Sequence, residues 1–122
     1  MTLTGNLFYG NTATTSPIIR RAYSPLPTSL GYNVVDIAFG STNSATTSSF
    51  AAVTGDAQFT DVGFDDNTIP PFVNTTGFVP VTTGTLHLHI PPQAALPAGF
   101  PTFDFNGATR TWPGAPGAVR QP

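Results

Sequence analysis

Short alternations of apolar and polar residues recur along the chain, and each has the period of two that is typical of a half-buried strand. No stretch of helical length keeps a period of 3.6, because glycine, proline or β-branched residues interrupt every candidate. We therefore predict strands and almost no helix. The alternating stretches are TLTGNLFY, GYNVVDIAF, SSFAAVT, AQFTDVGF, TGFVPVTT, TLHLHI and FPTFDF.

The clearest alternation lies in TGTLHLHIPP, which runs from Thr83 to Pro92. A strand presents successive side chains to opposite faces, so we expect Leu86, Leu88 and Ile90 to face the core. The proline pair at its end cannot donate to a ladder of strands and fixes where this strand stops.

The predicted turns and the spacing of the predicted strands indicate the fold class. Gly55 and Asp56 predict a turn between two strands, and the small polar residues 40–49 predict an exposed loop. No internal repeat is evident. Six or seven short strands at this spacing favour an all-β fold, an antiparallel β-sandwich or barrel with a jelly-roll-like outline.

The end of the chain differs from the rest. Residues 91–122 hold more than half of the thirteen prolines, which favours extended backbone over the interior of a sheet. We therefore divide this single-domain protein into a β-rich domain, residues 1–90, and an extended arm, residues 91–122. Aromatic residues spaced along the arm are expected to anchor it on an interface with other subunits. They are Phe100, Phe103, Phe105 and Trp112.

Composition narrows the class of function. The chain has 122 residues, no cysteine and only 8% charged residues, with a net charge of −2. Disulfides and thiolate chemistry are excluded, and a nucleic-acid groove is not expected because phosphate binding needs clustered positive charge. The chain has no apolar run long enough for a membrane span and no basic, apolar leader, so we expect synthesis in the cytoplasm. A surface of Thr, Ser and Asn suits a protein packed against other copies.

The two histidines, His87 and His89, fall on the same side of the predicted strand, roughly 6.5–7 Å apart from the rise of a strand. Two imidazoles do not complete a metal shell. The element HLH resembles the His-x-His element of trimeric tail fibres and spike tips of bacteriophages, which implies a shared iron site if threefold symmetry supplies six imidazoles. We instead expect both side chains to face outward, toward solvent or a neighbouring subunit, without metal or other cofactor.

Other candidate chemistry is sparse. The acids of GDAQFTDVGFDDN could offer oxygen ligands to calcium, but their spacing fits no calcium loop and a turn is the favoured interpretation. The sequence has no Gly-x-Ser-x-Gly element and no phosphate-binding glycine loop. We therefore expect no enzyme and no catalytic residue.

These features together resemble the decoration, or cement, proteins that coat the heads of tailed bacteriophages. The resemblance is one of composition over the whole chain. It implies a homotrimer on the virion surface that bridges subunits of the major capsid protein, with no nucleic acid or membrane as partner. The alternatives are a fibre, spike or tail subunit, or a receptor- or glycan-binding module in which exposed aromatic residues stack on sugar rings.

Overall fold

The computed structural model describes residues 1–12, 14, 25–42, 44, 46–58, 89–104, 106–114 and 117. Within these residues it has seven strands of two residues each, a single 3-10 turn and no α-helix. This scarcity of helix agrees with the sequence-based prediction. No described helix is long and apolar enough to cross a membrane.

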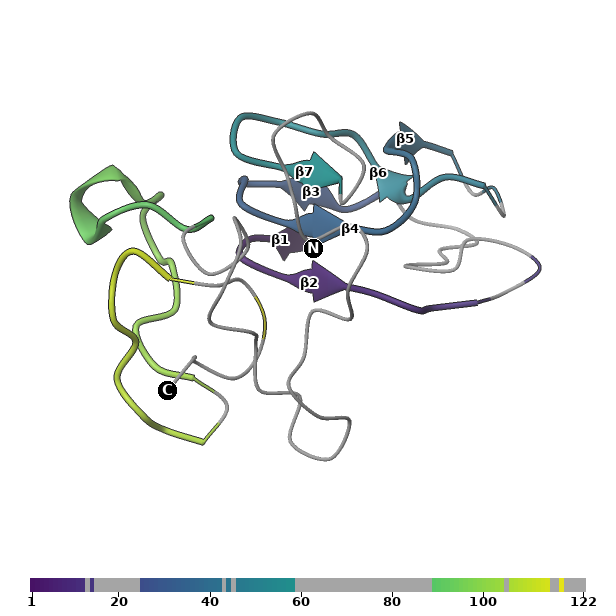
Figure 1. The fold of residues 1–122 in the computed structure, drawn as a ribbon. Coiled ribbons are helices and arrows are strands. Elements are labelled where there is room, and N and C mark those ends of the chain that lie inside the picture. The colour runs from purple at the N-terminus through teal and green to yellow at the C-terminus, as the bar shows by residue number, and fades with distance from the viewer. Residues whose placement is uncertain are drawn as a thin grey trace.

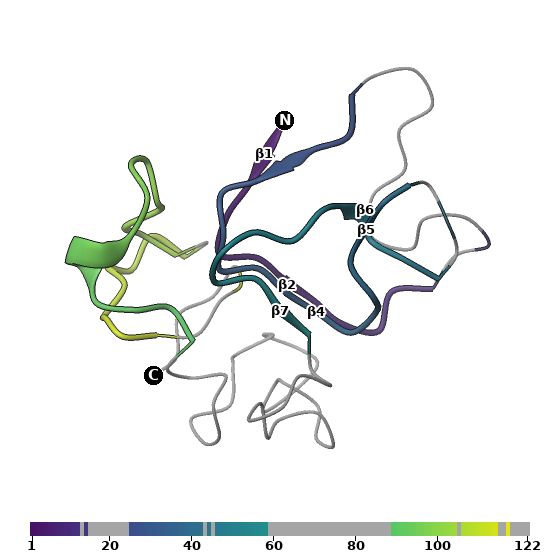
Figure 2. The ribbon, with the colours of Figure 1, turned by 90° about the horizontal axis from the view of Figure 1, so that it is seen from above.

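Three passes of the chain lie on top of one another in their second halves, and the first two passes also pair in their first halves (Figures 1 and 2). β1 pairs with β3 in parallel, and β2, β4 and β7 form a three-stranded parallel sheet in that order. The strands, in pass order, are β1 (Thr2–Leu3) and β2 (Leu7–Phe8), then β3 (Thr28–Ser29) and β4 (Val34–Val35), then β6 (Ser49–Phe50) and β7 (Ala57–Gln58).

The predicted antiparallel sandwich or barrel is therefore wrong. Among the named strands, antiparallel pairing occurs between β5 (Gly40–Ser41) and β6. The turn at Gly55 and Asp56 is confirmed, since the Asp56 N–H donates to the Val53 carbonyl over 3.0 Å. However, it acts as a corner within one pass and does not reverse the chain, because β6 and β7 belong to different sheets.

Polar side chains at these corners form a ladder through the stack. The corner ladder consists of Asn6, Asn33 and Asp56, each directly preceding a strand of the three-stranded sheet. Asn33 Oδ1 accepts from the Asn6 backbone N–H at 3.1 Å and from the Asn6 side-chain amide at 2.9 Å. Asp56 Oδ1 accepts from the Asn33 backbone N–H at 2.8 Å and from Asn33 Nδ2 at 2.9 Å. Each pass thus provides hydrogen-bond partners for polar groups of the next pass.

The ladder also reveals a repeat that the sequence did not show. Its members are separated by 27 and 23 residues, so the expectation of no internal repeat is wrong. The middle corner carries an additional residue, Tyr32, between Gly31 and the ladder asparagine. Tyr32 has φ 61°, the left-handed region that most side chains avoid. The uneven spacing and this insertion hide the repeat.

Aromatic side chains fill the core beside the corners. The Phe50 ring lies 6.1 Å from the Phe8 ring and 5.7 Å from the Phe39 ring, measured between centroids. Leu3 and Val35 complete this cluster. Aromatic pairs at such separations add to the free energy of burial.

Burial extends to both faces of β4 and to part of the predicted exposed loop. Val34 and Val35 are both fully buried, so β4 is covered on both faces, as strands of parallel sheets commonly are. The predicted exposed loop, residues 40–49, begins in β5 and ends in β6, and Ser48 and Ser49 are fully buried. The Ser48 hydroxyl donates to the Phe50 carbonyl at 3.0 Å, which lets one of these polar side chains lie inside.

The described part of the arm is folded, which differs from the expected extended arm. It contains the 3-10 turn η2 (Gln93–Ala95) and a tight turn built on the buried carboxylate of Asp104. Asp104 Oδ1 accepts from the backbone N–H groups of Asn106 and Ala108 at 2.9 and 2.8 Å. Such local side-chain bonds offer the backbone an alternative to extended structure.

Candidate functional site

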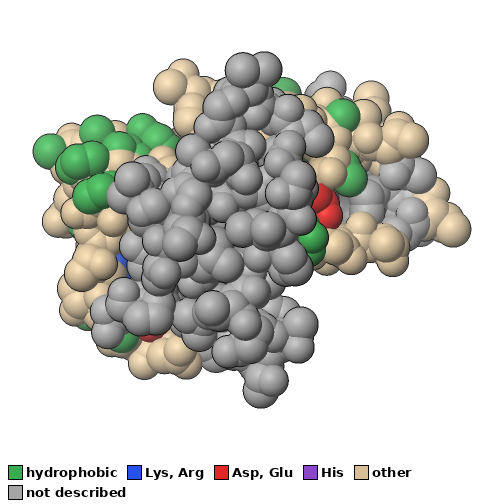
Figure 3. All heavy atoms as spheres, in the orientation of Figure 1, with side chains coloured by type: hydrophobic (Ala, Val, Ile, Leu, Met, Phe, Trp, Pro, Cys, Tyr) green, Lys and Arg blue, Asp and Glu red, His purple; other side chains and the backbone are tan. Residues whose placement is uncertain are grey.

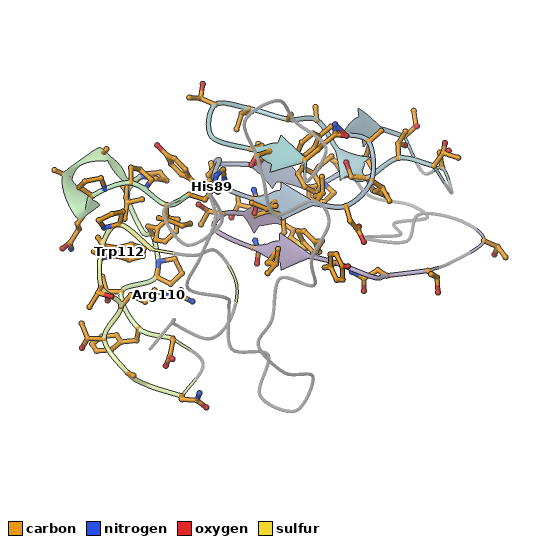
Figure 4. The ribbon with its side chains drawn as sticks, viewed as in Figure 1. His89, Arg110 and Trp112 are labelled. Atoms are coloured by element: carbon orange, nitrogen blue, oxygen red, sulfur yellow. The ribbon has the colours of Figure 1, made fainter. Side chains whose placement is uncertain are left out.

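Two backbone contacts hold the arm in place, one at its base and one on the stack. Ile90, which is fully buried, pairs with Gly114 through two backbone hydrogen bonds of 2.8 and 3.0 Å. Farther along, the Gly117 N–H donates to the Gly5 carbonyl of the first pass at 2.8 Å. In Figure 4, Arg110 and Trp112 lie on the arm and His89 lies where the arm joins the stack. The arm therefore packs on its own chain.

Two of the four predicted interface anchors contact each other. The rings of Phe100 and Trp112 lie edge to face, with centroids 5.3 Å apart. Phe100 also covers Gly5, where a Cβ atom would come within 2.5 Å of the phenyl ring. Phe103, in contrast, is 58% exposed, and Phe105 lies outside the described residues. Of the described anchors, Phe103 thus offers the most open aromatic surface.

Arg110 ties two parts of the arm together. Its Nε donates to the Phe103 carbonyl at 3.3 Å, and its Nη2 donates to the Gly117 carbonyl. Burial lowers the pKa of Arg110 from its usual value, and the nearby Asp104 carboxylate partly offsets this effect. The sequence pattern alone did not assign Arg110 a role. Its position two residues before the predicted anchor Trp112 was the available signal.

A groove of about 260 Å³ lies between the first pass and the arm. One wall is formed by residues 4–8 and the other by Phe100, Pro101, Arg110 and Gly117. It combines edge backbone, apolar residues and a half-buried cation, a combination suited to binding a chain segment.

A second hollow, of about 230 Å³, lies on the arm near η2. Gln93, Thr102 and Trp112 are among the residues that line it. An aromatic ring beside an amide and a hydroxyl is a surface on which a sugar ring can stack and form hydrogen bonds.

His89 lies in a partly buried position. Its ring packs edge to face on Tyr32, with centroids 6.4 Å apart. This placement differs from the expectation that His89 faces outward, because the ring covers the corner at Gly55 within its own chain. His87, Leu86 and Leu88 lie outside the described residues, so the predicted strand is described only at its end, where Ile90 is buried as expected.

Burial lowers the pKa of His89 below its ordinary value, and two weaker effects, a hydrogen bond with the Gly55 backbone and the charge of Asp56, oppose it. The unfolded chain therefore binds more protons as the pH falls below about 6.5. We expect the contribution of His89 to stability to be complete above that pH and lost as the pH falls toward the folded-state pKa. Urea unfolding at pH 7.5 and 5.5 measures this loss. The variant His89→Gln should lose less stability between the two pH values, and equal losses would contradict the assignment.

The described part of the chain does not bring a metal site together. It contains no group of three His, Cys, Asp or Glu residues placed to hold a metal ion. Asp56, the described member of the predicted acidic cluster, uses its carboxylate within the corner. Its Oδ2 accepts a hydrogen bond from the Val53 N–H at 2.9 Å, while its Oδ1 accepts hydrogen bonds from Asn33.

Comparisons with known proteins identify no relative. No family model matches the chain, and neither a curated protein nor a solved structure matches it. The function is therefore inferred from the geometry of the stack, the arm and the groove between them.

Proposed function

We propose that the protein is a non-enzymatic structural subunit that works by packing against other protein surfaces in a larger particle. The observation that carries this proposal is the stack of parallel passes, in which each pass contacts its neighbours and adds length along one axis. Architectures of this kind form extended, modular bodies. The low charge and the absence of cysteine also support an assembly role.

For the setting we propose a virion, and the corrected fold changes the preferred place within it. Parallel stacking supports an elongated fibre or spike element better than a compact sandwich would have done. A decoration subunit on the head is the second candidate, favoured by the apolar surface of the arm. Figure 3 shows hydrophobic side chains gathered over the η2 end of the arm. The exposed apolar residues of the arm include Pro92, Ala94, Ala95, Ala98 and Phe103.

Self-association tests the proposed function. We expect size-exclusion chromatography with light scattering to show oligomers that increase with protein concentration, and negative-stain electron microscopy to show elongated particles. Compact particles would instead favour the decoration role. A chain that stays monomeric at every concentration and does not bind virion heads would contradict both.

The exposed arm aromatic allows a sharper test. Phe103→Ser should weaken self-association by about tenfold or more if this side chain anchors a subunit contact. The melting temperature should change little, because 58% of Phe103 is already exposed. Thr12→Ser, at an exposed position of the first pass, is the control. If the Phe103 variant associates as strongly as the unchanged protein, Phe103 is not part of the interface.

A further inference from the structure

We propose that the groove between β2 and the arm binds an extended segment of a partner protein, which adds a strand beside β2 and places a carboxylate against Arg110. This inference deepens the proposed function, because it names the chemistry of one partner. It rests on the backbone of the first pass and on the charge at the end of the groove.

Among the described strands, β2 lies at the edge of its sheet, and one side of its backbone pairs with no described strand. Leu7 lies opposite Val34, and the Val34 N–H donates to the Asn6 carbonyl at 2.8 Å. In a parallel pair with this register, the flanking residues bond to the partner strand and the peptide groups of Leu7 itself point away from it. No described residue forms a hydrogen bond with them. An incoming strand would therefore find an N–H and a C=O ready to pair.

The same edge already accepts a backbone hydrogen bond at its corner. The Gly5 carbonyl receives the Gly117 N–H at 2.8 Å. Gly5 has a left-handed φ of +63° at this corner, and Leu7, whose outward direction follows from its pairing with Val34, lies two residues farther along the same pass. A peptide bound there would continue the contact that Gly117 begins. Addition of a strand to an exposed edge is a recurrent mode of peptide recognition.

Arg110 gives the groove a preference for negative charge. A guanidinium group has five N–H donors, and Arg110 uses one on Phe103 and one on Gly117. Figure 4 shows its side chain running from the arm toward the stack. Asp104, also in the arm, is the acidic residue whose charge raises the pKa of Arg110. A carboxylate on the incoming segment would pair with the remaining donors and offset the cost of the half-buried cation.

The small volume and apolar lining of the groove suit a side chain of a peptide whose backbone runs along β2. The groove volume of about 260 Å³ lies below the usual range of pockets for small organic ligands, roughly 300 to 1,000 Å³. Leu7 and Phe100 are apolar residues of its lining, and they suit a β-branched side chain at alternate positions of a strand. The occupant that fits these observations is an extended, β-branched segment with one acidic residue.

The test uses the full chain and an array of fluorescein-labelled pentapeptides in which valine and threonine alternate. Each peptide is acetylated and amidated and is made as a pair that differs only by Asp or Asn at one position. We expect fluorescence polarisation to show about tenfold tighter binding of the Asp member in some pairs. Arg110→Gln should abolish that difference, whereas Arg110→Lys, which keeps the charge, should retain most of it.

Leu7→Pro tests the strand addition, because proline removes the outward N–H without removing a bond to β4. It should weaken both members of a pair by a similar factor, and circular dichroism checks that the variant is folded. The proposal is overturned if no pair discriminates, if the difference survives in Arg110→Gln, or if both Arg110 variants lose it equally. If Leu7→Pro binds the peptides as tightly as the unchanged protein does, the proposed strand addition is wrong. None of these outcomes depends on whether the protein self-associates, so failure here is distinct from failure of the proposed function.

Discussion

Replacing Asn33 with alanine is expected to lower the free energy of unfolding by about 3 to 5 kcal/mol, the upper end of single-site effects. Asn33 is fully buried, and its side chain links all three passes. It accepts from the amide of Asn6 and donates to Ser29 Oγ at 2.8 Å and to Asp56 at 2.9 Å. Alanine would leave several of these groups buried without a partner, at about 1 to 3 kcal/mol each.

Urea unfolding monitored by circular dichroism measures this effect. Asn106→Ala is the matched control, because the Asn106 side chain is exposed on the turn of the arm, and it should cost less than about 0.5 kcal/mol. Asn33→Asp adds a second test, because it places a carboxylate beside that of Asp56. This variant should be unstable at neutral pH and should recover in part when acid protonates one of the two groups. Equal stability of the Asn33 and Asn106 alanine variants would show that the ladder does not hold the stack.

Replacing Gly31 with alanine should destabilise the protein by about 3 kcal/mol or more. Gly31 has φ +100°, and a Cβ atom there would lie 2.5 Å from the carbonyl oxygen of Thr54 in the next pass. Two backbones approach each other at this corner, so neither can move away without disturbing the stack. The variant therefore suffers both strain in its backbone and a steric clash.

Gly107→Ala separates these two effects. Gly107 has a similar positive φ of +78°, but a Cβ atom there would have no neighbour within 4 Å. We expect a loss of only about 1 to 2 kcal/mol from the left-handed backbone. Urea denaturation of both variants provides the comparison. If Gly107→Ala costs as much as Gly31→Ala, close stacking of the passes is not the reason for glycine at the corner.

The sequence was sufficient for some elements of the fold. The lack of a helical period, the turn at Gly55 and the burial of Ile90 all follow from local rules, and the structure agrees with them. Parallel stacking could not be predicted in the same way. Strands of two residues carry almost no alternation, so their direction depends on contacts between residues far apart in the chain.

For the candidate site, too, the sequence predicted some features and not others. Aromatic spacing predicted Phe100 and Trp112 as anchors of an interface with other subunits, but it could not show that the two rings pack on each other within the chain. Arg110 attracted no attention in the sequence because its role depends on Gly117 and Gly5, which are brought together by the fold. His89 was expected to be outward because alternation specifies relative faces and not what covers each face.

The uneven spacing of the corner ladder has a consequence for how this protein can vary. Steps of 27 and 23 residues reach equivalent positions in adjacent passes, so the stack does not depend on the length of the chain between corners. Lengthening a flexible connection costs only about 0.6 kcal/mol for each doubling. Foreign sequence could therefore be inserted between passes and displayed at the margin of the stack, which makes the protein a scaffold for surface diversification.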